Sequence, residues 1–307
     1  MYPIKKVIIG LDLSDLDKTM VEFADFLAKA SAVEDVYFVN VIKNLYVPKE
    51  VLKEFPDMVE NAIKERKGEM EKKFEKFTTG DHKANFHFNV LTGKIADSIL
   101  KFTKEKDIDL IVMGRREKAA ESGSLAQRLA RRAACSLLII PEGTVAKMDK
   151  ILVPSDFSEH SKLALEEAIN IAQLNDNSTE ITVQNVFTVP TGYHYTGKTF
   201  EEFTEVMKKN AVKNYKKFIS TIDTKGIKLK AVYSQDTNED VTTDMVDKAH
   251  DIGANAIIVG AKGRTATTAF FLGSIAERLI QLDNDIPLMI VRPKGKNAGF
   301  LEFLKEL

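Results

Sequence analysis

Three glycines and a serine lie in a short run between an apolar stretch and an amphipathic stretch near the end of the chain. The run GAKGRTATTAFFLGS extends from Gly260 to Ser274 and includes Gly263 and Gly273; NAIIV precedes it and IAERLIQLD follows it. Glycine allows a positive φ and lets a ligand come close to the backbone. Backbone amides at the start of a helix attract anions. The run therefore predicts an anion site between a strand and a helix.

Other residues of this run strengthen the prediction of phosphate binding. Lys262 and Arg264 bring positive charge, and the Ser274 hydroxyl can either cap the helix or bind a phosphate. The spacing G-x2-G-x9-G-S is neither that of a P-loop nor the G-x-G-x-x-G of dinucleotide-binding folds. A flexible turn whose serine only caps a helix is the alternative. The cations and the strand-and-helix context favour the phosphate site.

The elements that position this run occur twice in the chain. KKVIIGLDLSDLDK aligns with DKILVPSDFSEHSK, so that Asp12 matches Asp156, and GSLAQRLA aligns with GSIAERLI, so that Gly123 matches Gly273. The order of the matching segments is kept, which indicates a tandem duplication with a boundary near residue 146. The predicted domains are residues 1–146 and 147–294, followed by an amphipathic tail at 295–307.

Apolar, β-branched runs alternate with stretches of helical periodicity in both halves. The expected strands are VIIGL, VYFVNVI, FHFNVL, LIVMG and LLII, then ILVP, ITVQNVF, LKAVY, AIIVG and LMIV. Nearly continuous apolar runs are typical of strands covered on both faces. The pattern predicts an α/β protein with two tandem Rossmann-like, doubly wound domains, each with a five-stranded, mainly parallel sheet. Ligands of such sheets bind beyond the carboxyl ends of the strands.

Composition excludes several classes of protein. The net charge of −1 argues against a protein that coats nucleic acid, and no nucleic-acid partner is expected. A single cysteine, Cys135, excludes an internal disulfide and fits a reducing compartment. The sequence has no run near the ~20 apolar residues of a membrane span and no secretory leader pattern. A cytoplasmic protein without a membrane span is expected.

The combination of G-x2-G-x9-G-S after a strand with an acidic residue after the first strand resembles the universal stress protein family. In the second half the resemblance includes ILVPSDFSEHSKLAL, QNVF, IIVGAKG and GSIAERLI, and it covers nearly the whole chain as two copies. It implies an α/β sandwich that binds ATP or AMP, with Mg²⁺ as the candidate metal and its ligands unknown. Because single-domain members commonly dimerise, it also implies an intramolecular pseudo-dimer of the two domains, with a homodimer as a further option.

The resemblance assigns roles to individual residues of the second half. Asp156 would lie near the ribose or a metal ion, and Pro154 and the backbone of Val186 would border the adenine. A helix N-cap is the alternative role for Asp156, although Ser158 could serve as that cap instead. The phosphates would be held by Gly260, Lys262, Gly263, Arg264, Gly273, Ser274 and the amide of Ile275.

The first half departs from the motif. Glu117 stands where the second glycine would be, and an acidic side chain there would repel phosphate. The following loop is also four residues shorter than its counterpart. This half is expected to hold a degenerate site with a structural role, or one for a smaller ligand. In the second half, YSQDTNED lacks the glycine that VLTGK has in the first. The first-domain candidates are Asp12, Gly114, Gly123 and Ser124.

The first hypothesis is a nucleotide-binding protein of stress response or signalling, with ATP or AMP held mainly by the second domain. No general base for an attacking water is evident, so binding with negligible turnover is expected. The second hypothesis is a ligand-independent interaction scaffold or a carrier of an apolar ligand, with an unused nucleotide site. A nucleotide-using enzyme of a related α/β class is the third.

Overall fold

The computed structural model describes most of the 307-residue chain. The described residues are 3–30, 33–43, 45, 47–80, 82–116, 120–237, 240–263, 272–282 and 284–294. They form two compact units, Tyr2–Lys147 and Met148–Arg292, with the short segment from Pro293 grouped with the first.

The first unit contains one five-stranded sheet. Its strand order is β3-β2-β1-β4-β5, and every neighbouring pair is parallel. The order reverses direction between β1 and β4, which is the switch point where ligands of such sheets bind. The elements are β1 (Lys6–Gly10), α1 (Leu16–Ala30), β2 (Asp35–Ile42), α2 (Lys49–Glu54), α3 (Met58–Phe77), β3 (Asn85–Thr92), α4 (Ile95–Lys106), β4 (Leu110–Arg115), α5 (Ala120–Arg132) and β5 (Ser136–Pro141).

The second unit repeats this arrangement. Its strand order is β10-β9-β6-β7-β8, again parallel throughout, and its switch point lies between β6 and β9. The prediction of two doubly wound, five-stranded domains is therefore confirmed. The elements are β6 (Lys150–Pro154), α6 (Glu159–Leu174), β7 (Glu180–Phe187), the 3-10 helix η1 (Thr191–Thr196), α7 (Phe200–Ile219), β8 (Leu229–Gln235), α8 (Val241–Asp251), β9 (Ala256–Gly260), α9 (Ser274–Gln281) and β10 (Leu288–Val291).

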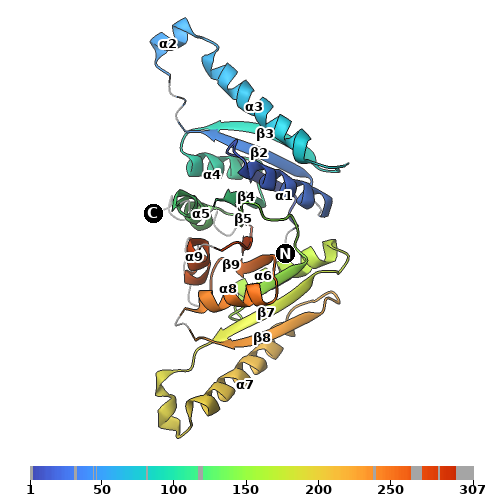
Figure 1. Ribbon diagram of the computed structural model, residues 1–307, viewed down its shortest axis with the longest axis vertical. Helices are drawn as coiled ribbons and strands as arrows, with labels where there is room; N and C mark the ends of the chain where they lie inside the picture. Colours follow the sequence, from blue (N-terminus) through green and yellow to red (C-terminus); the bar gives the residue numbers. More distant parts are fainter. Residues whose placement is uncertain are drawn as a thin grey trace, which may run out of the picture. The chain divides into compact units, whose positions relative to one another are not determined.

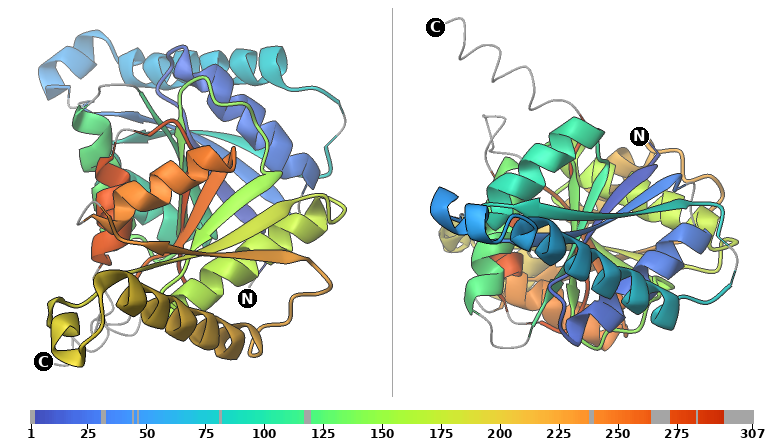
Figure 2. Two further views of the ribbon diagram at one scale, coloured as in Figure 1. Left: turned by 60° about the horizontal axis from the view of Figure 1, so that its bottom comes forward. Right: turned by 90° about the horizontal axis from the view of Figure 1, so that it is seen from above.

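Helices cover both faces of each sheet (Figure 1, Figure 2). In the first unit α1 packs on α3 and α4 packs on α5; in the second unit α6 covers β6 and β9, and α8 packs on α9. This two-sided cover explains why the central strands are almost wholly apolar, as in the fully buried run Val7–Ile9 of β1. Among the helices of the described residues, none combines the length and apolar character needed to cross a membrane.

Two positions that are apolar in the first core are polar in the second. Glu167 of α6 aligns with Phe23 of α1, and Gln184 of β7 aligns with Val39 of β2; all four side chains are buried. The amide of Gln184 donates to the Ser234 hydroxyl at 3.1 Å. Burial raises the pKa of Glu167 from 4.5 to about 7, against a hydrogen bond from Asn170 that lowers it. The second core therefore contains an acid that is largely protonated below neutral pH.

Glu167 is expected to make the stability of the protein depend on pH. Because its pKa is higher in the folded than in the unfolded chain, its contribution is intact below pH 4.5 and declines as the pH rises towards about 7. The rise of the Glu167 pKa from 4.5 in the unfolded chain to about 7 in the folded chain corresponds to about 3 kcal/mol of unfolding free energy. Glu167→Gln should remove most of this decline between about pH 5 and about pH 8 in urea unfolding. The neighbouring Glu166→Gln should retain it; equal pH profiles for the native chain and Glu167→Gln would contradict the assignment.

Candidate functional site

The turn between the first strand and the first helix has the same backbone form in both units. Phe157 has a φ of 63°, and Leu13, which aligns with it, has a φ of 65°. In the second unit Asp156 Oδ1 accepts a hydrogen bond from the Ser158 amide at 3.1 Å. The Ser158 hydroxyl in turn accepts from the Ser161 amide and caps α6. Ser158 is therefore the N-cap, and Asp156 belongs to the turn before it.

An asparagine on the adjacent strand supports each turn. Asn185 of β7 donates from Nδ2 to the Ser155 carbonyl at 2.8 Å, and Asn40 of β2 donates to the Leu11 carbonyl at 2.9 Å. Left-handed backbone costs a non-glycine residue about 1 kcal/mol or more, so such contacts are needed to hold the turn. Neither asparagine belongs to the glycine motif, so neither was predicted to support the turn. Their signal was the alignment of an asparagine in QNVF with one in FVNV.

The last residue of β9 must be glycine because the backbone of α6 lies against it. A Cβ placed on Gly260 would lie 2.4 Å from the His160 carbonyl oxygen, far inside van der Waals contact. In the first unit a Cβ on Gly114 would lie 2.5 Å from the Leu16 side chain. Both glycines therefore permit close packing of the fourth strand of the unit on its first helix.

The other two glycines bring three segments of the second unit together. A Cβ on Gly263 would lie 3.2 Å from Asp156 Oδ2, and one on Gly273 would lie 3.2 Å from Lys262 Cα. Of the two properties of glycine, a positive φ is not used here: Gly273 has a φ of −64°, and neither Gly260 nor Gly263 is among the described glycines with positive φ. The absence of a side chain instead allows these segments to approach closely.

Helix α9 begins where the motif predicts. Gly273 is its N-cap, and the Gly273 amide donates to the Ala261 carbonyl at 2.8 Å, so this amide is used inside the protein. Ser274 is the first helical residue and its hydroxyl does not cap the helix. Within the described part of the chain, the amides of Ser274 and Ile275 have no acceptor, as is usual for the first turn of a helix. Arg264 lies outside the described residues.

Two cationic residues lie beside this helix start. Lys262 follows β9, and Arg292 follows β10, whose last residue Val291 accepts a hydrogen bond from the Ala261 amide at 3.0 Å. Burial and then the charge of Arg292 lower the pKa of Lys262. Arg292 is 6% exposed. Arg292 was not among the predicted site residues, although its place after the last strand puts it at the same sheet edge as the glycine loop.

The part of the sheet edge that was predicted to border the adenine base differs between the two units. Pro154 is buried at the end of β6, and Val186 is half-buried near the end of β7. After β8, the Asp236 amide donates to the last residue of β7, just as the amide of Gly93 donates to the last residue of β2. Gly93 has a φ of 116°, whereas Asp236 is not among the described residues with positive φ. A carboxylate thus replaces a glycine at this edge of the second sheet.

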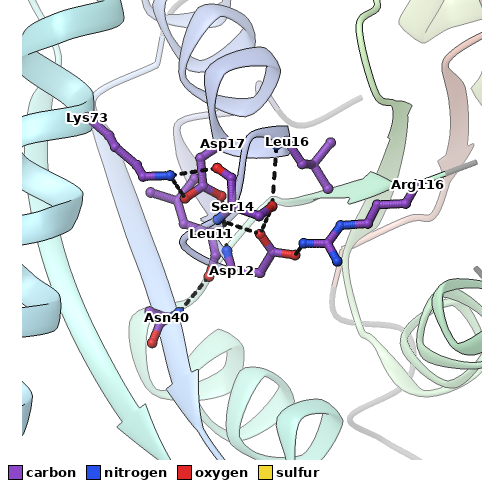
Figure 3. A network of polar contacts seen from close by, with 8 residues as sticks. All are labelled: Leu11, Asp12, Ser14, Leu16, Asp17, Asn40, Lys73 and Arg116. Carbon is purple, nitrogen blue, oxygen red and sulfur yellow. Dashed lines mark hydrogen bonds and ion pairs between the residues drawn. The ribbon is translucent and has the colours of Figure 1, made fainter.

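The candidates of the first unit are arranged differently from their counterparts. Asp12 Oδ2 forms an ion pair with Arg116 Nη2 at 2.6 Å (Figure 3). Gly123 and Ser124 lie inside α5, which begins at Ala120, so this pair is not at the start of a helix. Glu117 lies outside the described residues. In neither unit does the described part of the chain gather three His, Cys, Asp or Glu side chains as a metal site.

The fold and these turns define a class of protein: a tandem pair of doubly wound α/β domains, each with a polar turn at its switch point. A model of the universal stress protein family matches residues 3–141 and again 147–292. The chain therefore belongs to the universal stress protein family, as a member with two tandem domains.

Relatives of known name or structure agree with this assignment. One universal stress protein of Methanocaldococcus jannaschii is 29% identical over 164 residues, covering 48% of this chain and 96% of the relative. A second from the same organism is 30% identical over 142 residues, covering 44% and 81%. The crystal structure of a universal stress protein from Archaeoglobus fulgidus aligns with 95% of this chain and with 98% of its own chain. The two sequences are 18% identical, and the TM-score is 0.62. That structure shares the fold over both domains.

Gly260→Ala is expected to destabilise the second domain strongly. The added methyl group would meet the backbone of His160, which no rotamer change can move away. Overpacking of this kind costs about 1–3 kcal/mol of unfolding free energy. The matched control is Gly68→Ala in α3, where a Cβ meets nothing within 4 Å and where alanine should add about 0.5–1 kcal/mol. Urea unfolding measures both; a Gly260→Ala variant as stable as the native chain would refute the close approach.

Proposed function

We propose that this protein binds a nucleotide, ATP or AMP, in its second domain and acts in stress response or signalling. One observation carries the proposal: a Cβ placed on Gly263 would lie 3.2 Å from Asp156 Oδ2, so this carboxylate lies close against the backbone of Gly263. This contact joins the turn after β6 to the segment that carries Lys262 and leads to the start of α9. A polar ribose and a phosphate chain match this sequence of groups.

The three parts of the nucleotide correspond to three groups of residues. Asp156 would accept hydrogen bonds from the ribose or share a Mg²⁺ ion with the phosphates, since magnesium prefers oxygen ligands. The helix start and two cations would hold the phosphates, because backbone amides and positive charge both favour anions. Base contacts are assigned to Pro154 and Val186, and phosphate contacts to Gly260, Lys262, Gly263, Gly273, Ser274, Ile275 and, outside the described residues, Arg264.

A second candidate function, an interaction scaffold, is favoured by exposed apolar side chains. Large exposed hydrophobic residues occur on α2, on η1 and near the starts of α3 and α7, the segments that connect the second and third strands of each domain. Tyr195 of η1, with 87% of its surface exposed, is the extreme case. Such surfaces commonly bind other proteins.

Calorimetry of Mg·ATP, ADP and AMP binding tests the nucleotide site. The native chain should bind with a Kd in roughly the micromolar range, and Gly263→Glu should abolish binding. The new carboxylate would stand beside Asp156 and would repel phosphate. Gly192→Glu, in η1 of the same domain, adds the same charge where the nearest atom is 3.9 Å away and should bind normally. Binding retained by Gly263→Glu would place the nucleotide elsewhere, and no binding by the native chain would favour the scaffold.

The aligned aspartates offer a matched pair of substitutions. Asp156→Asn should weaken Mg·ATP binding about tenfold or more, because a charged hydrogen bond contributes about 1.5–3 kcal/mol. Asp12→Asn, the same change at the same position of the first domain, should leave the Kd unchanged. Titration calorimetry of both variants measures the difference. Equal weakening by the two substitutions would be incompatible with a site in the second domain alone.

A further inference from the structure

We propose that the outward side of helix α7 binds a membrane surface that carries anionic phospholipid headgroups. Five exposed lysines, which we call the lysine face, lie on this side: Lys208, Lys209, Lys213, Lys216 and Lys217. Binding there would not involve the nucleotide, because α7 packs on β7 and β8, whereas the switch point of the second domain lies between β6 and β9.

The side of α7 that faces the sheet is apolar, so the opposite side is left to solvent. Ala211 and Phe218 are buried, and the ring of Tyr215 lies edge-on to that of Tyr233 on β8, with centroids 6.2 Å apart. The helix packs on β7 and β8 (Figure 1). Because its apolar side is already used in this way, α7 would rest on a bilayer by its charges and would not insert as an isolated amphipathic helix does.

The lysines form a row along the outer side of the helix. Lys209, Lys213 and Lys216 are four and three residues apart, a spacing that places side chains one above another on a helix. Lys208 and Lys217 flank this row. Among the described residues, no carboxylate pairs with any of the five. The lysine face is therefore a continuous surface of positive charge.

The charge of α7 is segregated along its length. Residues 206–222 contain the five lysines and no Asp or Glu, whereas the three glutamates of the helix lie within residues 201–205. The helix dipole favours acidic residues in the first turn and basic residues in the last, but its effect falls off beyond those turns. It accounts for Lys216 and Lys217, which lie in the last turn. The other three lysines lie nearer the middle of the helix and need a different explanation.

The corresponding helix of the first domain has balanced charge. Acidic and basic residues are interspersed along α3, and basic residues of this helix are used within their own domain. Lys67 pairs with Glu71 at 3.8 Å, and Lys73 pairs with Asp17 at 3.1 Å. An anionic surface would meet charges of both signs on α3 but only positive charge on the lysine face.

Exposed aromatic residues lie just before the lysine face. The ring of Tyr193 in η1 contacts those of Phe200 and Phe203 at the start of α7, with centroids 5.5 and 6.3 Å apart. Beside this cluster, Tyr195 is 87% exposed. Tyrosine is favoured at the boundary between a membrane and water, because its ring is apolar and its hydroxyl is polar. Tyr195 would enter the headgroup region while the lysines hold the phosphates.

The composition of this surface favours a lipid headgroup over a nucleic acid. Arginine is the usual residue for recognising nucleic acid, because its guanidinium binds phosphates and bases at two points, and the chain has no arginine within residues 133–263. Lysine is a compact, flexible point charge that suits a mobile array of headgroups. A platform for single strands would need exposed rings among its cations, whereas Tyr195 and Phe200 precede the first lysine.

Sedimentation of the full chain with lipid vesicles tests the proposal. The native chain should bind vesicles of phosphatidylcholine that contain about one-third phosphatidylserine, and should not bind vesicles of phosphatidylcholine alone. Each lysine near an anionic surface strengthens binding about fivefold, so the α7 pair Lys209→Gln with Lys213→Gln should weaken binding about 25-fold. Salt at about 0.5 M should release the native chain, because it screens the headgroup charge.

The matched control is the α3 pair, Lys64→Gln with Lys67→Gln. It removes the same two charges from exposed positions of the equivalent helix and leaves the lysine face intact. The α3 pair should bind anionic vesicles as the native chain does. Urea unfolding should show both pairs to be as stable as the native chain, since the substituted side chains are exposed.

A fluorescent reporter tests the role of the aromatic cluster. Because the chain has no tryptophan, Tyr195→Trp introduces a single emitter. Its emission should shift to shorter wavelength with the anionic vesicles, as the indole leaves water, and should not shift with phosphatidylcholine alone.

Three outcomes would overturn the proposal. The first is no binding of the native chain to anionic vesicles, and the second is equal weakening by the α7 and α3 pairs. The third is tighter binding to duplex or single-stranded DNA than to vesicles at equal phosphate concentration, lost in the α7 pair, which would make the lysine face a nucleic-acid site. None of these results depends on whether the second domain binds Mg·ATP, which calorimetry decides separately.

Discussion

No side chain fits between the end of β9 and the first turn of α6, and the site of the second domain depends on that contact. Because the closest clashes at Gly260 would be with the backbone of His160, main-chain atoms limit how closely the strand and the helix approach each other. Asp156 lies just before that helix, and Gly263 lies just after that strand. Their separation is therefore fixed by the packing of two regular elements, which is how a rigid scaffold holds a binding loop.

The same turn geometry occurs in both domains, although its surroundings have diverged. An asparagine on the next strand and a left-handed residue after the aspartate are kept in each. The residues that contact the turn differ: they include Lys73 and Arg116 in the first domain, and Tyr215 and Gly263 in the second. The backbone thus determines where a carboxylate oxygen points, and the neighbouring side chains determine what it meets.

The fold was predictable from the sequence because buried parallel strands are continuous apolar runs, and all ten runs are strands. The details of the site were less predictable from the sequence. Spacing alone left the N-cap open between Asp156 and Ser158, since both are good capping residues. Glycine has two uses, and only the packed structure shows that Gly260 is needed for close approach. Arg116 and Arg292 were not predicted as residues near the site, because the residues that they lie beside in space are far from them along the chain.

Charged side chains lie near both turns, but they differ between the two domains. In the first domain each cation beside the turn contacts a carboxylate, so that the ligand-free turn is electrically balanced. In the second, Lys262 lies near Arg292 and beside the positive end of α9, and its lowered pKa records the unfavourable surroundings of its charge. An anion bound there would interact favourably with these cations and with the amides at the helix start. A ligand that binds only the folded chain also adds to its stability.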